Sequence, residues 1–441
     1  MTSTRPTLNR DILRLAVPAL GALVAEPLFL IIDSALVGHL GVTPLAGLGI
    51  ASAVLQTVVG LMVFLAYSTT PAVARRFGAG SLSKAVSVGI DGMWLALALG
   101  AVLALVGYAA TPFLVGLFGA APEVAGQAET YLGISMWGLP AMLIVFAATG
   151  LLRGMQDTVT PLWIAGLGFA ANALLNWFFI YGLGWGIAGS ASGTVVAQWG
   201  MVAAYVVVVG GLARRHAASV RPHREGVTGS ARSGGWLFLR TVSLRFALLA
   251  TVVIATSLGT AELAGWQVAF TIFSTAAFAL DALAIAAQAL IGKGLGAGDE
   301  HFVRRVLGRT VAWGAWFGVI VGAVIGGLSG VIGLVFTGDA AIAALVQPAL
   351  VVLAVAQPVC GIVFVLDGVL IGAGDARYLA LAGLLNLVPF LPALVLVAAV
   401  HPVGAAGLAW LAVAFFGVYM LARLATLGWR VRGHTWMTVP V

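Results

Sequence analysis

The chain has 441 residues, of which 61% are hydrophobic and 8% are charged, and its formal net charge is +7. A soluble protein could not bury so much apolar surface, so this composition excludes a soluble globular fold and indicates that lipid is the solvent. The basic residues are scattered over short polar segments, unlike the single basic face of a nucleic-acid-binding protein, so we expect no nucleic-acid partner.

Apolar stretches long enough to cross a bilayer follow one another along the chain. Twelve are predicted, over residues 12–38, 45–70, 86–110, 125–150, 159–181, 187–211, 237–258, 263–290, 306–335, 343–371, 378–400 and 404–428. They are too long for lipid-facing β-strands and lack the alternation of such strands. The predicted fold class is therefore all-α, an integral membrane protein of twelve transmembrane helices.

Four segments of the first half recur in the second half at a constant offset of 218 residues. The pairs are 40–47 with 258–265, 77–80 with 295–298, 152–157 with 370–375, and 186–191 with 404–409. One such match can arise by chance in a chain rich in Gly and Ala, but four in order indicate a duplicated unit. Internal repeats of helices are typical of secondary transporters.

The duplication divides the chain into a six-helix N-terminal lobe over 1–212, a polar linker over 213–235 and a six-helix C-terminal lobe over 236–441. An even number of spans per half returns the chain to the same side, so the two repeats are expected to be parallel. The linker is rich in Arg, His, Ser and Gly and is predicted to be flexible.

The 22 Lys and Arg residues fall at the two termini, on every second connection between spans, or in the parts of the spans next to these segments. By the positive-inside rule, both termini and the linker are predicted to be cytoplasmic. The predicted location is the cell inner or plasma membrane, with membrane lipid as a partner.

The candidates among the carboxylate side chains within the predicted spans are Glu26, Asp33, Asp91, Asp281 and Asp367. An ionisable residue within a span is a functional candidate because its charge is costly in lipid. No Lys or Arg is evident at a comparable depth, so we expect these carboxylates to lack a salt bridge. A carboxylate of this kind can take up a proton near neutral pH, as a proton-coupled carrier requires.

Asp33 is the first candidate for the coupling site, although a neighbour such as Ser34 could satisfy it by a hydrogen bond. Glu26 lies seven positions earlier on the same helix face, directly before Pro27. Glu26 is predicted either to relay protons with Asp33 or to bond a backbone group that Pro27 frees. Asp281 and Asp367 are predicted coupling sites of the second half, in spans eight and ten.

Four amide and hydroxyl side chains within spans are predicted to line a substrate cavity: Asn172, Asn176, Thr194 and Gln288. Asn172 and Asn176 lie one helical turn apart on one face, where they could bond either a carboxylate or a neighbouring helix. Ser190 and Ser192 could complete the same pocket together with Thr194, or these small hydroxyl residues could pack at a helix interface.

The remaining polar residues suggest structural roles. Asp91 lies near the inner end of its span and is expected to meet water, and Asp157 and Asp375 are expected to cap helices or brace loops. The single Cys360 excludes an internal disulfide and a cysteine metal cluster. Phosphate-binding loops and HExxH motifs are absent from the sequence, so we predict no metal, no cofactor and no enzymatic activity.

Several motifs resemble the multidrug and toxic-compound extrusion (MATE) transporters, in their DinF-like branch. They are Pro18 with Glu26-Pro27 and Asp33-Ser34 in the first span, followed by 37–41, 152–158, 279–282 and 294–299. The resemblance covers essentially the whole chain. It implies two six-helix lobes forming a V and alternating access driven by entry of a proton or a sodium ion, with Asp33 as the main protonation site of the N-terminal lobe.

The resemblance has one departure, because prokaryotic relatives often carry an Asp where this chain has Asn176. Asp367 matches a carboxylate that sodium-coupled relatives use in the C-terminal lobe. The coupling ion is therefore predicted to be a proton, with sodium as the alternative.

Together these observations predict a monomeric antiporter that exports amphipathic, often cationic, small molecules. An alternative is a flippase of lipid-linked precursors, which would need several basic residues at depth. A membrane-embedded transferase would need clustered Asp or His near the interface, which this sequence lacks.

Overall fold

The fold is described by a computed structural model for residues 5–336 and 340–439. Within these ranges the regular structure consists of helices and contains no β-strand, so the predicted all-α class is confirmed. The backbone of Glu26 belongs to helix α1 (Arg5–Gly38), but its side chain lies outside the described part. The chain forms two compact units, each described separately: unit 1 is Met1–Ala16 with Gly235–Val441, and unit 2 is Val17–Gly234.

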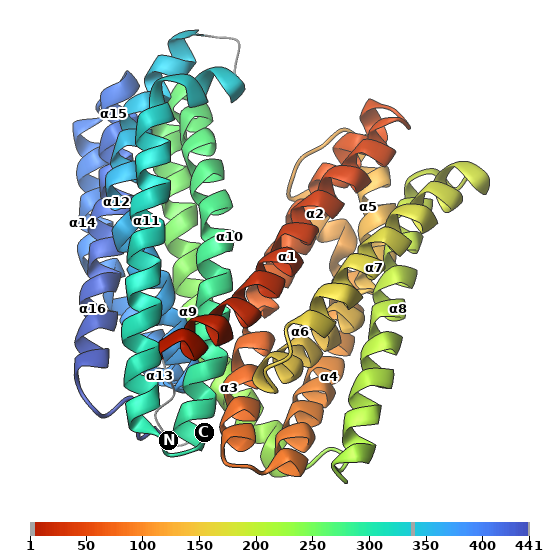
Figure 1. The fold of residues 1–441 in the computed structure, drawn as a ribbon. Helices are drawn as coiled ribbons and strands as arrows, with labels where there is room; N and C mark the ends of the chain where they lie inside the picture. Colours follow the sequence, from red (N-terminus) through yellow and green to blue (C-terminus); the bar gives the residue numbers. More distant parts are fainter. Residues whose placement is uncertain (1–4, 337–339, 440–441) are drawn as a thin grey trace. The chain divides into compact units, whose positions relative to one another are not determined.

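Unit 2 contains most of α1 and the seven α-helices that follow it. These are α2 (Val42–Met62), α3 (Phe64–Gly78), α4 (Leu82–Gly116), α5 (Pro122–Met136), α6 (Leu139–Gly154), α7 (Val159–Trp177) with the short π-helix η1 (Phe178–Gly182), and α8 (Gly186–Arg215). Helices α7 and α8 lie side by side (Figure 1). Helices α4 and α6 also pack closely, because Gly100 faces the backbone of Pro140 and leaves no room for a Cβ atom.

Unit 1 contains the remaining helices. These are α9 (Arg224–Leu258) from Gly235 onward, α10 (Thr260–Gly296), α11 (Glu300–Phe336), α12 (Ala340–Gly372), α13 (Ala376–Leu385), α14 (Leu387–Val400), α15 (Gly404–Ala412), the π-helix η2 (Val413–Tyr419) and α16 (Met420–Arg432). Helices α11 and α12 lie side by side (Figure 1). Packed aromatic rings fill the centre of this unit, including Trp266, Phe273, Phe390, Phe415 and Phe416.

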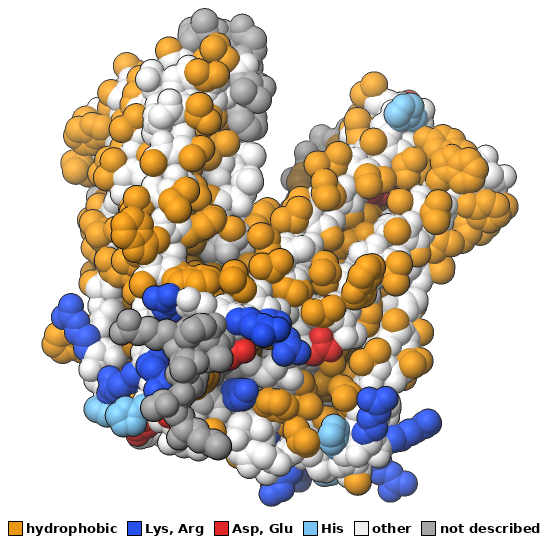
Figure 2. Space-filling view, in the orientation of Figure 1, with side chains coloured by type: hydrophobic (Ala, Val, Ile, Leu, Met, Phe, Trp, Pro, Cys, Tyr) orange, Lys and Arg blue, Asp and Glu red, His pale blue; other side chains and the backbone are white. Residues whose placement is uncertain are grey.

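The membrane-spanning helices agree with the sequence prediction. The described residues contain 11 helices long and apolar enough to cross a bilayer, or 12 if α5 and α6, bent by 48°, form one span. The predicted span 45–70 consists of α2 and α3, which join at Val63. In each unit, Lys and Arg gather at one end, whereas hydrophobic side chains cover most of the remaining visible face (Figure 2).

The repeated Leu-Gly motif has the same backbone geometry in both halves. Gly41 precedes α2 with a φ of 124°, and Gly259 precedes α10 with a φ of 150°. Side-chain-bearing residues rarely adopt such angles, so glycine is required at both turns. The sharp turn between successive membrane helices is therefore a shared feature of the two repeats.

The segment that joins the two units is more helical than the sequence suggested. Helix α8 continues to Arg215 and α9 begins at Arg224, so only residues 216–223 of the expected linker 213–235 lie between the helices. The boundary also differs at the N-terminus, because residues up to Ala16 belong to unit 1.

Candidate functional site

The predicted coupling residue Asp33 lies in a buried polar site formed by four helices of unit 2. Asp33 comes from α1, Tyr131 from α5, Asn176 from α7 and Ser190 from α8. Asp33 is only 4% exposed, and Asn176 and Ser190 are fully buried. Four polar side chains from four helices therefore meet inside unit 2.

The carboxylate of Asp33 accepts hydrogen bonds from three neutral side chains. The hydroxyl of Ser190 donates to Oδ1 at 2.6 Å, and Nδ2 of Asn176 donates to the same oxygen at 2.8 Å. The hydroxyl of Tyr131 donates to Oδ2 at 3.2 Å. Such donors stabilise an ionised carboxylate, which is purely an acceptor. The alternative that Asp33 is satisfied by Ser34 alone is therefore wrong.

The two asparagines form a chain of amides that ends on the carboxylate. Asn172 is 3% exposed, and its Oδ1 accepts a hydrogen bond from Nδ2 of Asn176 at 3.0 Å. The amide of Asn176 thus bridges Asn172 and Asp33, as their helical spacing suggested. Its Oδ1 is buried and lacks a hydrogen-bond partner among the described residues.

Charge at this site is not balanced by a cation. Within the described residues, no Lys or Arg lies within salt-bridge distance of Asp33. The absence of such a partner was predicted for this residue from the sequence. A buried carboxylate with only neutral donors is expensive to keep ionised, which makes it suited to exchange a proton.

The other predicted residues lie at different places. Thr194 is 8% exposed and lies one turn after Ser190 on α8, beside the site. Gln288 is buried on α10 of unit 1, where Asp281 is half-buried. The side chain of Glu26 is outside the described part of the structure, so its proposed relay with Asp33 stays a prediction.

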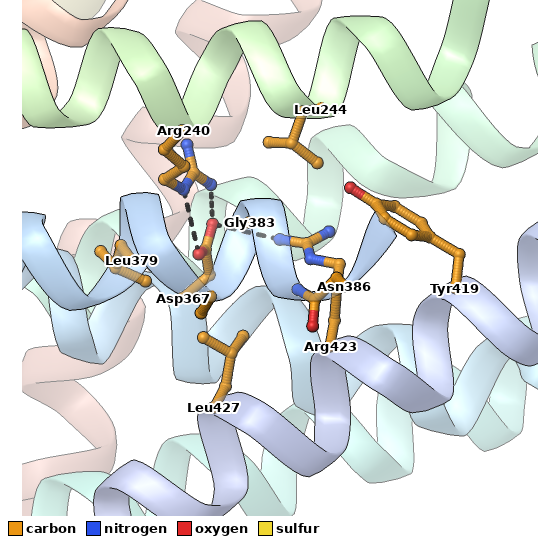
Figure 3. A pocket seen from close by; sticks show the side chains of 10 residues that line it. Arg240, Leu244, Asp367, Leu379, Gly383, Asn386, Tyr419, Arg423 and Leu427 are labelled. Carbon is orange, nitrogen blue, oxygen red and sulfur yellow. Dashed lines mark hydrogen bonds and ion pairs between the residues drawn. The ribbon is translucent and has the colours of Figure 1, made fainter. Parts of the chain in front are cut away.

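Asp367 contradicts the expectation of an unpaired carboxylate. In unit 1 it forms an ion pair with Arg240 of α9, whose Nε donates to Oδ1 at 3.2 Å, and its Oδ2 lies 3.4 Å from a guanidinium nitrogen of Arg423 on α16 (Figure 3). Both arginines are less than a tenth exposed. From the sequence, these arginines were expected to anchor helix ends at the membrane surface. Their contact with Asp367 was not predicted, because the residues are far apart along the chain.

Asp91 also differs from its predicted environment. It was expected to meet water, yet it is 2% exposed and accepts a hydrogen bond from the backbone N–H of His223 at 2.8 Å. The same face of α4 holds the connecting segment at three further points. Ser83 donates to Ala217 O at 3.1 Å, Ser87 Oγ accepts from Ser219 N at 3.1 Å, and Trp94 Nε1 donates to Val220 O at 3.0 Å. Residues 216–223 are therefore fixed along α4.

Replacing Asp91 with Ala should release this connecting segment. The substitution removes the carboxylate acceptor, whose hydrogen bond contributes about 1.5–3 kcal/mol, so the segment should open about ten- to a hundredfold more often. The exposed Arg221 and Arg224 should then be cleaved by trypsin correspondingly faster, as measured by gel densitometry on protein in detergent. Asp91→Asn is the matched control, because an amide oxygen still accepts from His223. Equal cleavage of wild type and Asp91→Ala would show that Asp91 does not hold the segment.

The repeat-related residues Asp157 and Asp375 have local roles. Asp157 accepts from the backbone N–H of Val159 and of Thr160, both at 3.0 Å, so its role as a helix cap is confirmed. Asp375 instead accepts from Nε of Arg430 at 2.6 Å and makes no side-chain cap bond. It braces α13 against α16, as the second of its predicted roles required.

Known proteins share this architecture. The family model MatE matches residues 18–178 and 237–395. The chain is 29% identical to the protein DETOXIFICATION 44, chloroplastic, of Arabidopsis thaliana, over 97% of this chain and 83% of that protein. It is 26% identical to the DNA damage-inducible protein F of Escherichia coli (strain K12), over 66% of this chain and 64% of that protein.

A solved structure extends the likeness to the whole fold. The crystal structure of a mutant of the Vibrio cholerae MATE transporter VcmN is similar with a TM-score of 0.88, at 22% sequence identity, and covers 98% of this chain and 99% of that chain. Because the MatE model matches most of both halves, the twelve-helix duplicated chain with its buried Asp33 site belongs to the MatE family of membrane transporters, which are not enzymes.

Proposed function

We propose that this protein is a proton-coupled antiporter that exports amphipathic, often cationic, small molecules, with Asp33 as the residue that binds the proton. The observation that carries the proposal is the buried carboxylate of Asp33, surrounded by neutral donors and without a basic partner in the described part of the chain. The names of the relatives, which refer to detoxification and to MATE transport, agree with an export role.

The donors around Asp33 suit a site that must accommodate both protonation states. When Asp33 is ionised, the hydroxyls of Tyr131 and Ser190 donate to it. When Asp33 is protonated, it becomes a donor, and either hydroxyl can rotate and accept because an O–H group has both functions. A sodium ion would instead need several oxygen ligands directed at it, whereas an amide N–H of Asn176 occupies one side of the carboxylate. The geometry therefore favours a proton over sodium.

The free energy that one proton supplies limits how far the substrate can be concentrated across the membrane. A proton that crosses about 100 mV supplies about 2.3 kcal/mol, but exchange for a monovalent cation cancels this electrical work. Only the pH gradient then drives export, at about 1.4 kcal/mol per pH unit. Export of a cationic substrate against a large concentration ratio would need a second coupling ion. Asp281 is the better candidate for that ion, because Asp367 is held by two arginines.

The proposed location is the plasma membrane, with both termini on the cytoplasmic side. The gathering of Lys and Arg at one end of each unit supports this orientation (Figure 2).

Everted membrane vesicles that contain the protein provide the test. Respiration establishes a pH gradient, which a fluorescent weak base reports, and ethidium is then added in sodium-free buffer. Proton antiport predicts an immediate partial collapse of the gradient that requires the protein. A response that appears only after sodium is added would assign the coupling to sodium. No response in either buffer would contradict antiport of this cation.

A further inference from the structure

A small pocket in unit 1 lies beside the ion pairs of Asp367. Arg240, Asp367, Asn386, Tyr419 and Arg423 contribute the polar part of its lining, as Figure 3 shows. Its cavity volume is about 10 Å³, which is about the minimum for one ordered water molecule. The space therefore suits a small occupant such as a single water molecule or a monoatomic ion.

The lining offers hydrogen-bond donors that the protein itself does not use. Tyr419 is 1% exposed, and its hydroxyl has no hydrogen-bond partner among the described residues, although its ring carries it toward Arg423 (Figure 3). Arg423 has five N–H donors, and its ion pair with Asp367 is a single contact at 3.4 Å. The Oδ1 of Asn386 accepts from Thr426 at 3.0 Å, which leaves the amide N–H groups of Asn386 as donors.

The charge of the lining is positive. Two arginines and one carboxylate line the pocket. The nearby Asp375 is engaged by Arg430 and so does not neutralise them. A water molecule could bond the tyrosine hydroxyl but would leave the buried positive charge uncompensated, which is costly in a low-dielectric interior. A small anion satisfies both the donors and the charge.

The backbone that carries Tyr419 departs from regular α-helical geometry. The residue ends the π-helix η2, one turn before Arg423 on α16. A π-helical segment interrupts a regular helix at a cost and occurs frequently at functional sites. Here it ends where Tyr419 and Arg423 both line the cavity.

We propose that this pocket binds one chloride ion, held by Arg423, the Tyr419 hydroxyl and the Asn386 amide. The site is too small for an organic anion. It lies in unit 1, whereas the Asp33 site lies in unit 2. Chloride binding at this pocket can therefore be tested independently of proton coupling at Asp33.

The test measures halide binding by the purified full-length protein in detergent. Sodium chloride replaces sodium gluconate at constant sodium and constant ionic strength, while the thermal unfolding midpoint and the ³⁵Cl NMR line width are recorded. A chloride site predicts that the midpoint stays constant well below the dissociation constant and then rises with the logarithm of the chloride, or bromide, concentration, because a ligand that binds only the folded state stabilises it. It also predicts a saturable chloride-dependent broadening.

Two variants identify the site. Tyr419→Phe keeps the ring and removes one donor to a charged ligand, so chloride affinity should fall by about tenfold or more. Tyr378→Phe is the matched control, because the Tyr378 hydroxyl donates to Thr426 O at 2.7 Å and does not line the pocket. Its affinity should equal that of wild type. Absence of a saturable chloride effect in wild type would overturn the proposal in favour of a bound water. Undiminished affinity in Tyr419→Phe would overturn it by placing the anion elsewhere.

Discussion

Vesicles that contain Asp33→Asn should show no substrate-triggered collapse of the pH gradient above vesicles without the protein. Asn has nearly the shape of Asp but cannot take up or release a proton, so the exchange cycle loses its coupling step. Its amide oxygen can still accept from Ser190 and Asn176, which share Oδ1, although its NH₂ group then faces the Tyr131 hydroxyl that donates to Asp33 in the wild type. We expect this mismatch to cost about 1–3 kcal/mol of stability without preventing folding.

Expression and folding must be matched before the transport rates are compared. Size-exclusion profiles in detergent report the folded fraction, and Asp299→Asn supplies the same chemical change at an exposed position, where Asp299 caps the start of α11. This control should retain the full dye response. Wild-type rates in Asp33→Asn at equal folded protein would exclude Asp33 as the proton site.

The second large effect concerns stability. Asp367→Asn should lower the free energy of unfolding by about 3–5 kcal/mol, because it leaves the guanidinium groups of Arg240 and Arg423 buried without their carboxylate. Equilibrium unfolding of the purified protein in mixed micelles measures this loss. The exposed Asp299→Asn should change the same quantity by less than about 0.5 kcal/mol.

A double substitution measures the interaction energy between Asp367 and Arg240 apart from their other contacts. Asp367→Asn combined with Arg240→Gln restores the wild-type net charge of the cluster, so it should be less destabilised than the sum of the two single changes. Strict additivity of the two losses, or a single Asp367→Asn as stable as wild type, would contradict a stabilising pair between these residues.

Much of the fold could be predicted from the sequence because lipid imposes simple requirements. Each span must be long, apolar and helical, so hydropathy locates it, and the offset between repeated motifs reveals the duplication. The residue Asp33 was identifiable for the same reason, since a charge is conspicuous in an apolar helix. Asn172 and Asn176 followed from helical spacing, and their hydrogen bond confirms it.

Partners that come from distant segments could not be predicted in this way. Arg240 and Asp367 are 127 residues apart. Arg240 and Arg423 lie near the ends of the predicted spans 237–258 and 404–428, where an arginine usually anchors a helix to the membrane surface. Tyr131 was missed because a tyrosine in a span is ordinarily an apolar or interfacial residue. Asp91 was misplaced because the segment that covers it was expected to be a flexible linker.

The duplication described above allows the two halves to be compared position by position. At the offset of 218 residues, the counterparts of Asp33, Asn172, Asn176 and Ser190 are Thr251, Phe390, Leu394 and Leu408. The counterparts of Asp367 and Arg423 are Thr149 and Tyr205, whose hydroxyls are hydrogen-bonded at 2.8 Å. Each half thus has a side-chain contact at this point of the repeat, but among these positions the first half is charged at Asp33 and the second half at Asp367 and Arg423. A chain assembled from two first halves would therefore carry the buried carboxylate twice and would lack the ion pair of Asp367 with Arg423.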